Sequence, residues 1–575
     1  MLETWNRYKN ACFELLSCSK FVALLCLVII AGYGILIVHP TVNWDFSLYK
    51  GDTGLVAATF FLMGRWGASL LAVVAAKFAP CWNEVFACCL LFWATLTWCT
   101  LWQLVSRGKI SITAQILFAL LFVSYPLNHE IFLYPLAFPG ICCGYLATGL
   151  SLIWAYEFWD NRRWSVVLIA IFFQAFAISV YQTFAVVYLC GVFAVLMISY
   201  IFRTDQSTKL SANLMRTSGY IGVLIGAMAL WIIIAKLPRL IFHVLAFPIP
   251  KTGGAADEIA WLTQDAGFFA QVGQLVKGLI YHFIYASLFY EALRFFLLSA
   301  FVVFVFSLIW SIRKRSWTPV YLAAGLVGAN FALSLIQGIP TYYRACQSFA
   351  LFVGVVWMAL YSLLGRHVRV QQVVVVMVAF LVLFQSRDLS LWFYNNYRRF
   401  EMDKNNFQMM VNTLEAKFGR DISKPIVVVG EVPPYRTLRN DEYPFNYLPS
   451  RYGPGECNGK NRFSSVGIKR EFYLFAKHVC GFVCVLPTQE QVAEAEAVLK
   501  QNQQPAWPLE GYIREYDQYI IVNLNVKAPS REWLDKQTPE MYLSESEKQL
   551  FHKLHVSERR KGLHDRFEKI YKALQ

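Results

Sequence analysis

The residues with the clearest chemical potential follow the first long apolar stretch of the chain. The polar loop there contains two acids, Asp45 and Asp52, and Trp44 precedes the first of them. A carboxylate so placed can act as a general base that accepts the proton of an attacking hydroxyl. Arg65 lies further on, within Gly64–Gly67, and its planar guanidinium suits a phosphate. The alternative interpretation is a set of solvated loop charges with one interfacial anchor.

The composition shows which kind of scaffold must position these residues. Of the 575 residues, 57% are apolar and 15% are charged, whereas a soluble domain is about 45–50% apolar and about 25% charged. A helix needs roughly 20 apolar residues to cross a bilayer, and such stretches recur between residues 21 and 384. The first, Phe21–Val38, is predicted to be a retained span, because no small-residue cleavage site follows it.

The breaks between apolar stretches alternate between basic ones and ones poor in lysine and arginine. The positive-inside rule places the basic breaks in the cytoplasm, namely Arg7/Lys9/Lys20, Arg107/Lys109, Arg162/Arg163, Arg203/Lys209/Arg216, Arg313/Lys314/Arg315 and Arg366/Arg369. This predicts about eleven spans of the required length, at 21–38, 82–106, 110–125, 140–158, 165–181, 183–202, 217–236, 293–311, 318–336, 348–364 and 370–386. An odd number of spans exports the C-terminal part of the chain.

Two further apolar segments do not fit this alternation. Leu55–Phe78 is interrupted by Gly64–Gly67, and Gln271–Tyr290 contains Lys277 and His282. If Leu55–Phe78 alone crossed the membrane, every later basic loop would move outside, against the charge bias. We therefore predict that both segments are interfacial or re-entrant on the outer side; the alternative, in which both cross, gives about thirteen spans and leaves the C-terminus outside.

The composition becomes that of a soluble domain from about residue 388. We predict an amphipathic helix, a strand, a helix opened by a capping box and a hairpin, at Phe407–Phe418, Pro425–Val429, Thr488–Lys500 and Gly511–Leu524. The predicted organisation is thus a polytopic helical membrane domain at 1–387 with the acids in its outer loop 39–80, an exported α/β domain at 388–526, and a charged tail at 527–575 that is helical or, alternatively, partly disordered.

Cysteine content and net charge add little about function. Cys457, Cys480 and Cys484 lie in the predicted exported domain, where one disulfide, a zinc site completed by His478, or no bond at all are the alternatives. The net charge of +15 is concentrated partly in the cytoplasmic loops, so it indicates topology and contact with anionic membrane lipids rather than nucleic acid. The chain contains no phosphate-binding P-loop, dinucleotide fingerprint or zinc-protease motif.

The pattern of a first span, an acidic loop and Gly-Arg-Trp before an interfacial helix resembles the bacterial serotype-converting O-antigen glucosyltransferases, which have the class C glycosyltransferase fold. Ile339–Arg344 (Ile-Pro-Thr-Tyr-Tyr-Arg) is similar to that family's outer arginine motif, and Pro505–Pro508 followed by a hairpin is similar to the end of its exported domain. The resemblance covers residues 20–525. The chain departs from the family where Trp44 precedes Asp45, since a paired acid is expected there.

The resemblance implies transfer of a sugar, glucose above all, from polyprenyl phosphate to O-antigen or another lipid-linked glycan at the periplasmic face of the inner membrane. Asp45 would be the general base in an inverting displacement, with Asp52 as its alternative. Cations would stabilise the leaving phosphate, namely Arg65, Arg344 and Lys277. Other side chains would hold the sugar or the acceptor, namely Trp44, His129, Glu130, Tyr342 and Tyr343.

Each of these assignments has an alternative. Aromatic residues at span ends are ordinarily interface anchors, and a His-Glu pair is ordinarily part of a solvated loop, although His129 and Glu130 could also bind a metal. No cofactor is required by the pattern, and a divalent cation is left open. Alternative functions are a lipid-linked sugar flippase or transporter, which would use charges in the middle of its spans and often internal repeats, an O-antigen polymerase or ligase, and a structural subunit.

Overall fold

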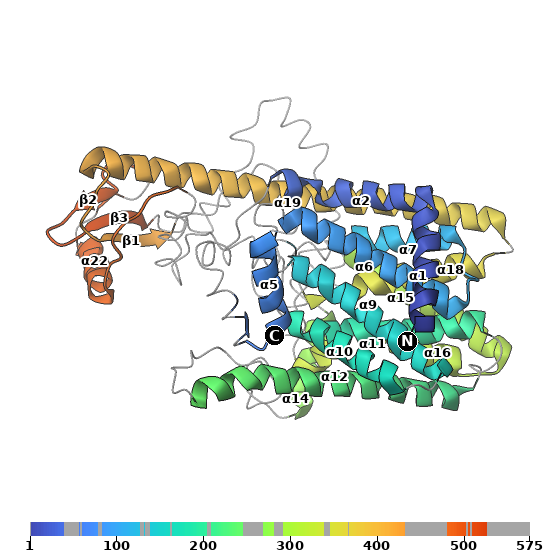
Figure 1. Ribbon diagram of the computed structural model, residues 1–575. Coiled ribbons are helices and arrows are strands. Elements are labelled where there is room, and N and C mark those ends of the chain that lie inside the picture. The colour runs from blue at the N-terminus through green and yellow to red at the C-terminus, as the bar shows by residue number, and fades with distance from the viewer. Residues whose placement is uncertain are drawn as a thin grey trace. The chain divides into compact units, whose positions relative to one another are not determined.

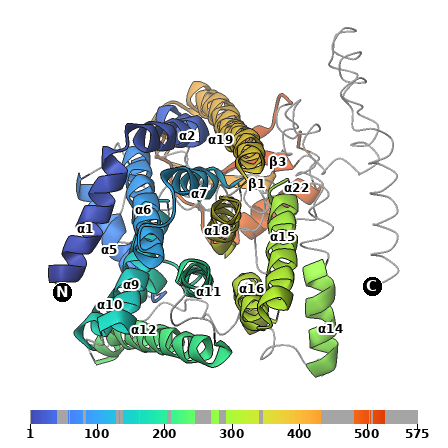
Figure 2. The ribbon, with the colours of Figure 1, turned by 90° about the vertical axis from the view of Figure 1, so that its right-hand side faces the viewer.

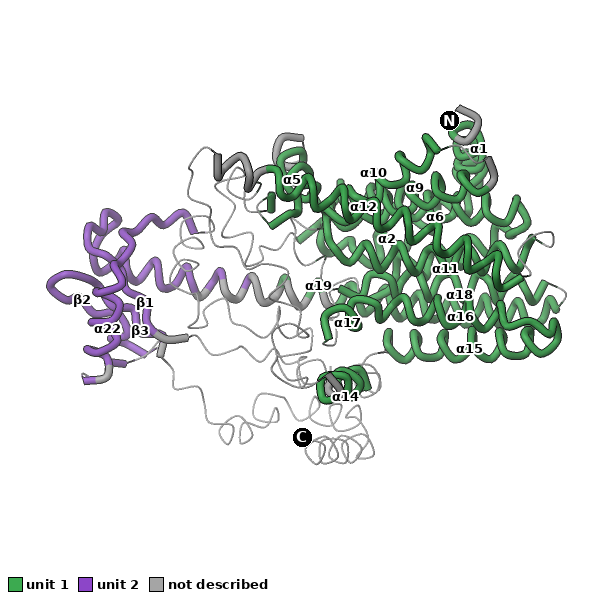
Figure 3. The backbone as a smooth tube through the Cα atoms, turned by 90° about the horizontal axis from the view of Figure 1, so that it is seen from below, with its two compact units in different colours: residues 1–398 green, residues 399–575 purple. Residues whose placement is uncertain are grey.

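The computed structural model describes most of the membrane domain and part of the C-terminal domain. The described residues are 2–39, 57, 60–61, 63–78, 83–126, 132, 138–161, 164–203, 209–244, 268–280, 291–338, 345–365, 367–431, 480–501, 504–505 and 509–525. The chain divides into two compact units, residues 1–398 and residues 399–575 (Figure 3).

The first unit is a bundle of apolar helices (Figure 1). Among the described residues, seven helices have apolar segments long enough to cross a membrane: α2 (Ser19–Val38), α6 (Asn83–Ser106), α9 (Phe138–Asn161), α11 (Phe184–Phe202), α12 (Leu210–Val244), α15 (Glu291–Lys314) and α19 (Val368–Phe418). Four shorter apolar helices accompany them: α7 (Ile112–Ser124), α10 (Trp164–Val180), α16 (Thr318–Ala329) and α18 (Ser348–Leu363). Ten of the predicted spans each coincide with one of these helices, and α16 covers the first part of the eleventh, 318–336. This confirms a polytopic helical membrane protein; the exact number of crossings stays a prediction.

The predicted span 318–336 differs from the structure because it is broken near its middle. α16 ends at Ala329, and the short helix α17 (Ala332–Gln337) follows. The side-chain amide of Asn330 donates a hydrogen bond to the carbonyl oxygen of Leu326, at 2.8 Å. Such a side chain competes with the backbone for helical hydrogen bonds. The polar residue Asn330 thus lies where the apolar helix is interrupted. A hydropathy average over the whole segment does not reveal this interruption.

Glycines allow the helices of the bundle to approach closely. A Cβ atom at Gly144 would overlap the ring of Phe184, and one at Gly191 would overlap Leu152. Between apolar helices in a membrane, association depends on close packing rather than on water exclusion, so small residues at crossings are expected. The indole of Trp98 fills the space beside them and donates to the carbonyl oxygen of Tyr145, at 3.1 Å.

Two short helices belong to the segments predicted not to span. α5 (Trp66–Phe78) lies across the direction of the bundle helices at one end of the bundle (Figure 1). α14 (Phe268–Leu279) has one buried side, with Gln271 and Leu275, while Lys277 is exposed. The crosswise α5 and the amphipathic α14 agree with the interfacial interpretation.

The amphipathic helix α1 (Leu2–Ser17) was not expected from the sequence. It lies across the end of the bundle opposite to α5 (Figure 1). The guanidinium group of Arg7, on α1, forms an ion pair with Glu157, which is buried near the end of α9. The hydroxyls of Tyr8 and Thr97 are 3.3 Å apart, so α1 is fastened to both α9 and α6.

The described part of the second unit contains a small sheet against a helix. β1 (Ile426–Glu431) pairs in parallel with β3 (Ile520–Asn525), which pairs antiparallel with β2 (Ile513–Glu515). Helix α22 (Gln489–Gln501) packs on this sheet through Val492 and Ala495.

The local predictions for this region are confirmed. The capping box is formed, since Thr488 N–H donates to Gln491 Oε1 at 2.9 Å and Gln491 N–H donates to Thr488 Oγ at 3.2 Å. The predicted strand and the hairpin are also present. Cys480 and Cys484 are free thiols, and burial raises the pKa of each to about 11; Cys457 and His478 lie outside the described residues.

Helix α19 differs from the prediction in its length. A last span at 370–386 and a separate amphipathic helix ending at Phe418 were expected, but one helix of 51 residues covers both. Residues 368–418 contain neither glycine nor proline, so the change from apolar to polar composition near Asp388 does not interrupt the backbone hydrogen bonds. The helix ends where Gly419 adopts φ +82°, a conformation that suits glycine.

The contact between α1 and the bundle gives a first prediction. Arg7→Ala removes one ion pair of buried Glu157. Because the Arg7 side chain is partly exposed, we expect a loss of about 1–3 kcal/mol of stability, less than for a fully buried pair. Thermal unfolding of the detergent-purified protein should show a lower midpoint for Arg7→Ala than for the control Lys9→Ala, an exposed neighbour. Adding Glu157→Gln to Arg7→Ala should recover part of the loss; equal midpoints for Arg7→Ala and Lys9→Ala would contradict the role of the ion pair.

Candidate functional site

Most of the predicted site residues belong to loops between the described helices. Arg65 and Lys277 are described; outside the described residues lie Trp44, Asp45, Asp52, His129, Glu130, Tyr342, Tyr343 and Arg344. The structure therefore bears on the site through Arg65 and through the helix ends from which these loops leave and to which they return.

The predicted phosphate-binding motif Gly64–Gly67 forms the turn before α5. Gly64 has φ +78°, and its carbonyl oxygen accepts a hydrogen bond from the indole Nε1 of Trp231 on α12, at 2.8 Å. The guanidinium of Arg65 lies over the ring of Tyr181, 5.0 Å from its centroid. The ring contacts the face of the guanidinium group, so the N–H donors in the guanidinium plane do not bond to it. Tyr181 therefore orients Arg65, and the N–H donors can still bind an oxyanion.

The turn at Gly64–Gly67 is also held against α10, because the backbone of Gly67 approaches the end of that helix closely. The N–H of Gly67 donates to the hydroxyl of Ser179, at 3.1 Å. A Cβ atom at position 67 would overlap that hydroxyl and also approach Val180 and the carbonyl oxygen of Phe176. Trp66 packs edge-on against the ring of Phe176. The start of α5 contacts the end of α10 so closely that only glycine fits at position 67.

The turn that carries Tyr181 is connected through side chains to the loop that carries Arg344. Phe184, at the start of α11, packs edge-on against Tyr145 of α9, with 5.2 Å between ring centroids. The hydroxyl of Tyr145 donates to the carbonyl oxygen of Gln347, at 2.8 Å. Gln347 is three residues after Arg344. The motif with Arg65 and the end of the loop with Arg344 are thus tied to the same end of the bundle.

Aromatic packing brings the flank of the acidic loop to the flank of the loop with His129 and Glu130. Tyr33, near the end of α2, contacts the rings of Phe132 and Phe138, and Phe132 is two residues after Glu130. The hydroxyl of Tyr33 donates to the carbonyl oxygen of Val123 near the end of α7, at 2.8 Å. The end of α2, from which the loop with Asp45 leaves, is therefore packed against both ends of the loop with Glu130.

Lys277 is the described candidate with the weakest connection to the others. It is exposed on α14, and the chain on both sides of α14 lies outside the described residues. The following helix is tied to the bundle, since the hydroxyl of Tyr125 at the end of α7 donates to the carbonyl oxygen of Ala292, at 2.9 Å. The role of Lys277 in binding phosphate stays a prediction.

Buried polar groups occur in the helices that lead to these loops, and they were not predicted from the sequence. In the part of the chain that the structure describes, several lack a hydrogen-bond partner: Trp66 Nε1, Thr183 Oγ, Ser348 Oγ, Gln385 Nε2 and Ser386 Oγ. Buried polar groups are nearly always paired, so an unpaired one calls for a functional explanation. The sequence signal was present, since Gln347-Ser348 and Gln385-Ser386 are polar pairs that adjoin apolar helical stretches. Hydroxyl and amide groups of this kind suit a sugar.

A metal site receives no support from the described residues. Among them, no group of three or more histidine, cysteine, aspartate or glutamate side chains is arranged to hold a metal ion. The other candidate metal ligands lie outside that part of the chain, namely Asp45, Asp52, His129 and Glu130. Binding of a divalent cation by these residues stays a prediction.

A comparison with protein-family models gives one match. The model described as glucosyl transferase GtrII matches residues 34–363, which extend from the last turn of α2 to the end of α18. The match includes the acidic loop, Gly64–Gly67, the loop with His129 and Glu130, and the loop with Arg344. No curated protein and no solved structure matches the chain.

The contact at Gly67 gives a second prediction. Gly67→Ala should force the start of α5 away from Ser179, at a cost typical of overpacking, about 1–3 kcal/mol, and should displace Arg65 from Tyr181. We expect reduced thermal stability together with reduced activity in membranes. Gly222→Ala is the control, because a Cβ at Gly222 meets nothing within 4 Å. Ser179→Ala added to Gly67→Ala should restore part of both losses; wild-type behaviour of Gly67→Ala alone would show that the contact does not position the motif.

Proposed function

Because this chain belongs to the glucosyl transferase GtrII family, we propose that it transfers glucose from a polyprenyl-phosphate donor to O-antigen or another lipid-linked glycan. The observation that carries the proposal is the connected set of contacts from Arg65 through Tyr181, Phe184 and Tyr145 to Gln347. These contacts support a common site for two arginines that lie far apart in the sequence.

The nature of the donor follows from the membrane location. The basic breaks identify one end of the bundle as cytoplasmic by the positive-inside rule, and the motif with Arg65 belongs to the other end. Nucleotide sugars are made and kept in the cytoplasm, so a transferase acting on the outer side needs a sugar that a lipid phosphate has carried across. The phosphate of such a donor lies at the headgroup plane. Arginines at helix ends meet it at that depth.

In the proposed reaction, Asp45 accepts the proton of the acceptor hydroxyl as its oxygen attacks the anomeric carbon of the donor sugar. The bond from that carbon to the phosphate oxygen breaks in the same displacement, so the configuration inverts and polyprenyl phosphate leaves. Arg65 and Arg344, with Lys277, stabilise the negative charge that develops on the leaving phosphate. Asp52 is the alternative base.

Binding of the sugar and acceptor is assigned to polar and aromatic side chains beside these loops. Trp44, Tyr342 and Tyr343 would stack on sugar faces, while His129 and Glu130 would bind hydroxyls. The unpaired hydroxyls of Thr183, Ser348 and Ser386 support a polyhydroxylated ligand, because a sugar offers both donors and acceptors to such groups.

The direct test is a transfer assay with sealed membrane vesicles that contain the full chain. Radiolabelled polyprenyl-phosphate glucose should donate its sugar to the lipid-linked glycan fraction, whereas UDP-glucose without a polyprenyl-phosphate glucose synthase should not. Polyprenyl-phosphate galactose and mannose serve as matched donors for sugar specificity. Transfer directly from UDP-glucose in the absence of lipid carrier would overturn the donor assignment.

Replacement of the proposed base is the third prediction. Asp45→Asn keeps the size of the side chain and removes its basicity, so turnover should fall by about 10²–10⁴-fold. The variant should reach the membrane in wild-type amounts, which immunoblotting checks. Asp52→Asn is the matched control and should retain more activity; if instead Asp52→Asn is the inactive variant, the role of base belongs to Asp52.

The fourth prediction separates a phosphate ligand from a membrane anchor at Arg344. A lysine can replace an arginine that only extends to the headgroups, but it cannot reproduce two parallel hydrogen bonds to a phosphate. Arg344→Lys should therefore impair transfer almost as strongly as Arg344→Ala in the same assay, at unchanged protein level. Near-normal activity of Arg344→Lys would assign the residue to anchoring and leave the phosphate to Arg65.

A further inference from the structure

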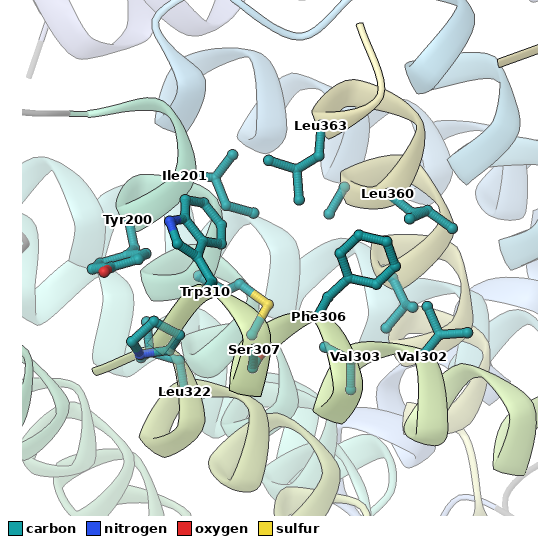
Figure 4. Close-up of a pocket in the computed structure, with 14 residues that line it drawn as sticks. Tyr200, Ile201, Val302, Val303, Phe306, Ser307, Trp310, Leu322, Leu360 and Leu363 are labelled. Atoms are coloured by element: carbon teal, nitrogen blue, oxygen red, sulfur yellow. The ribbon is translucent and has the colours of Figure 1, made fainter. Parts of the chain in front are cut away.

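An apolar pocket lies at the end of the bundle opposite to the candidate site. It is a partly open hollow between α11, α15, α16 and α18 (Figure 4). Its lining is almost entirely hydrocarbon and includes Ile201, Val303, Phe306, Trp310, Leu322 and Leu360.

The pocket and the basic end of α15 together extend over about half the thickness of a bilayer. Along α15 its lining runs from Val302 to Trp310, and the basic end of that helix begins at Arg313. The rise from Val302 to Arg313 is about 16 Å at 1.5 Å per residue, close to half of the roughly 30 Å hydrocarbon core. The depth therefore matches the acyl chain of a lipid in one leaflet.

The pocket opens beside exposed apolar surface rather than being sealed by the protein. Phe306 is 40% exposed and Leu363 is 40% exposed, while Val303 deeper in the pocket is 7% exposed. Tyr200 and Trp310 pack edge-on near the basic end, with 5.4 Å between their centroids. Aromatic rings of this kind are typical of the membrane interface, and an acyl chain can enter past them from the surrounding leaflet.

A cluster of positive charge lies at the end of α15 next to the pocket. Arg313, Lys314 and Arg315 are all exposed. None of the three has an ion pair with any acid in the described part of the chain. An apolar pocket below the exposed charges of Arg313, Lys314 and Arg315 is complementary to an anionic lipid, whose acyl chain is apolar and whose headgroup is negative.

The basic residues are held by a rigid turn. Arg315 has φ +48°, a left-handed conformation that costs energy for a residue with a side chain. The turn is secured by the hydroxyl of Ser311, which donates to the carbonyl oxygen of Ser316 at 2.6 Å, and by the N–H of Ser316, which donates to the carbonyl oxygen of Ser311 at 3.1 Å. The backbone position of the charges is therefore fixed before any ligand binds.

We propose that this pocket binds one acyl chain of an anionic phospholipid, whose headgroup phosphate lies on Arg313, Lys314 and Arg315. The site is distinct from the donor site, because it uses the other ends of α11 and α18. Tyr145 and Phe184 contact the candidate-site end of these helices, whereas Tyr200 and Leu363 line the pocket at the other end.

The test uses the purified full-length protein in nanodiscs made from equal amounts of phosphatidylglycerol and phosphatidylethanolamine, followed by gentle detergent extraction and native mass spectrometry. We expect one phosphatidylglycerol to be retained preferentially by the wild type. Val303→Trp fills the pocket and should abolish retention, while Val305→Trp, on a more exposed position of the same helix, should not. Val303→Trp is checked for folding by its thermal midpoint.

The charge is tested with matched variants. A triple variant that removes the cluster should weaken retention of phosphatidylglycerol by at least about tenfold. It combines Arg313→Gln, Lys314→Gln and Arg315→Gly, and glycine is chosen at position 315 because it suits the left-handed turn. Lys9→Gln, Lys20→Gln and Arg369→Gln combined remove as many exposed charges from α1, α2 and α19 and should have little effect. Equal retention of both lipids, retention that survives in folded Val303→Trp, or displacement of the lipid by polyprenyl phosphate would each overturn the proposal. None of these outcomes bears on sugar transfer, so failure here is separable from failure of the proposed function.

Discussion

The structure depends on one constraint, which is that backbone N–H and C=O groups in a bilayer must find partners within the protein. The apolar part of the chain meets it with helices, which Figure 2 shows in a view along the bundle. Residues with chemistry in their side chains are then concentrated in the loops at the ends of these helices. Arg65 and Gln347 come from distant parts of the sequence, yet the contacts of Tyr181, Phe184 and Tyr145 link them because their helices end at the same level.

The sequence predicted the helices well because hydropathy and length report directly on that constraint. Every predicted span except 318–336, which is broken after Ala329, coincides with one apolar helix. The capping box at Thr488 and Gln491 is formed as its chemistry requires. The failures have physical reasons. α1 is too polar for a hydropathy search and is stabilised by distant partners such as Glu157. α19 continues past Asp388 because helix propensity, rather than polarity, decides whether a helix stops.

The candidate site could be anticipated only in part. Residue type indicated Arg65, but its orientation over Tyr181 depends on the packing of α5 against α10, and no spacing in the sequence reveals such a partner. The buried polar groups of Ser348 and Ser386 were not predicted. Sequence periodicity indicates which face of a helix is apolar, but it does not indicate which residues of other helices contact that face. The acids and Arg344 lie outside the described residues, so their roles rest on chemistry and on family membership.

The two ends of the bundle have different chemistry for a reason that follows from the lipids they face. At one end, Arg65 is oriented by an aromatic ring, and the helices that lead to the candidate site contain buried hydroxyls without partners. Such groups suit a phosphate joined to a polar sugar. At the other, Arg313, Lys314 and Arg315 are exposed above a hydrocarbon pocket, an arrangement suited to a phosphate joined to an acyl chain. The guanidinium group is the same at both ends. Under both proposals, the groups beside the cations, hydroxyls at one end and hydrocarbon at the other, decide which phosphate ligand each end prefers.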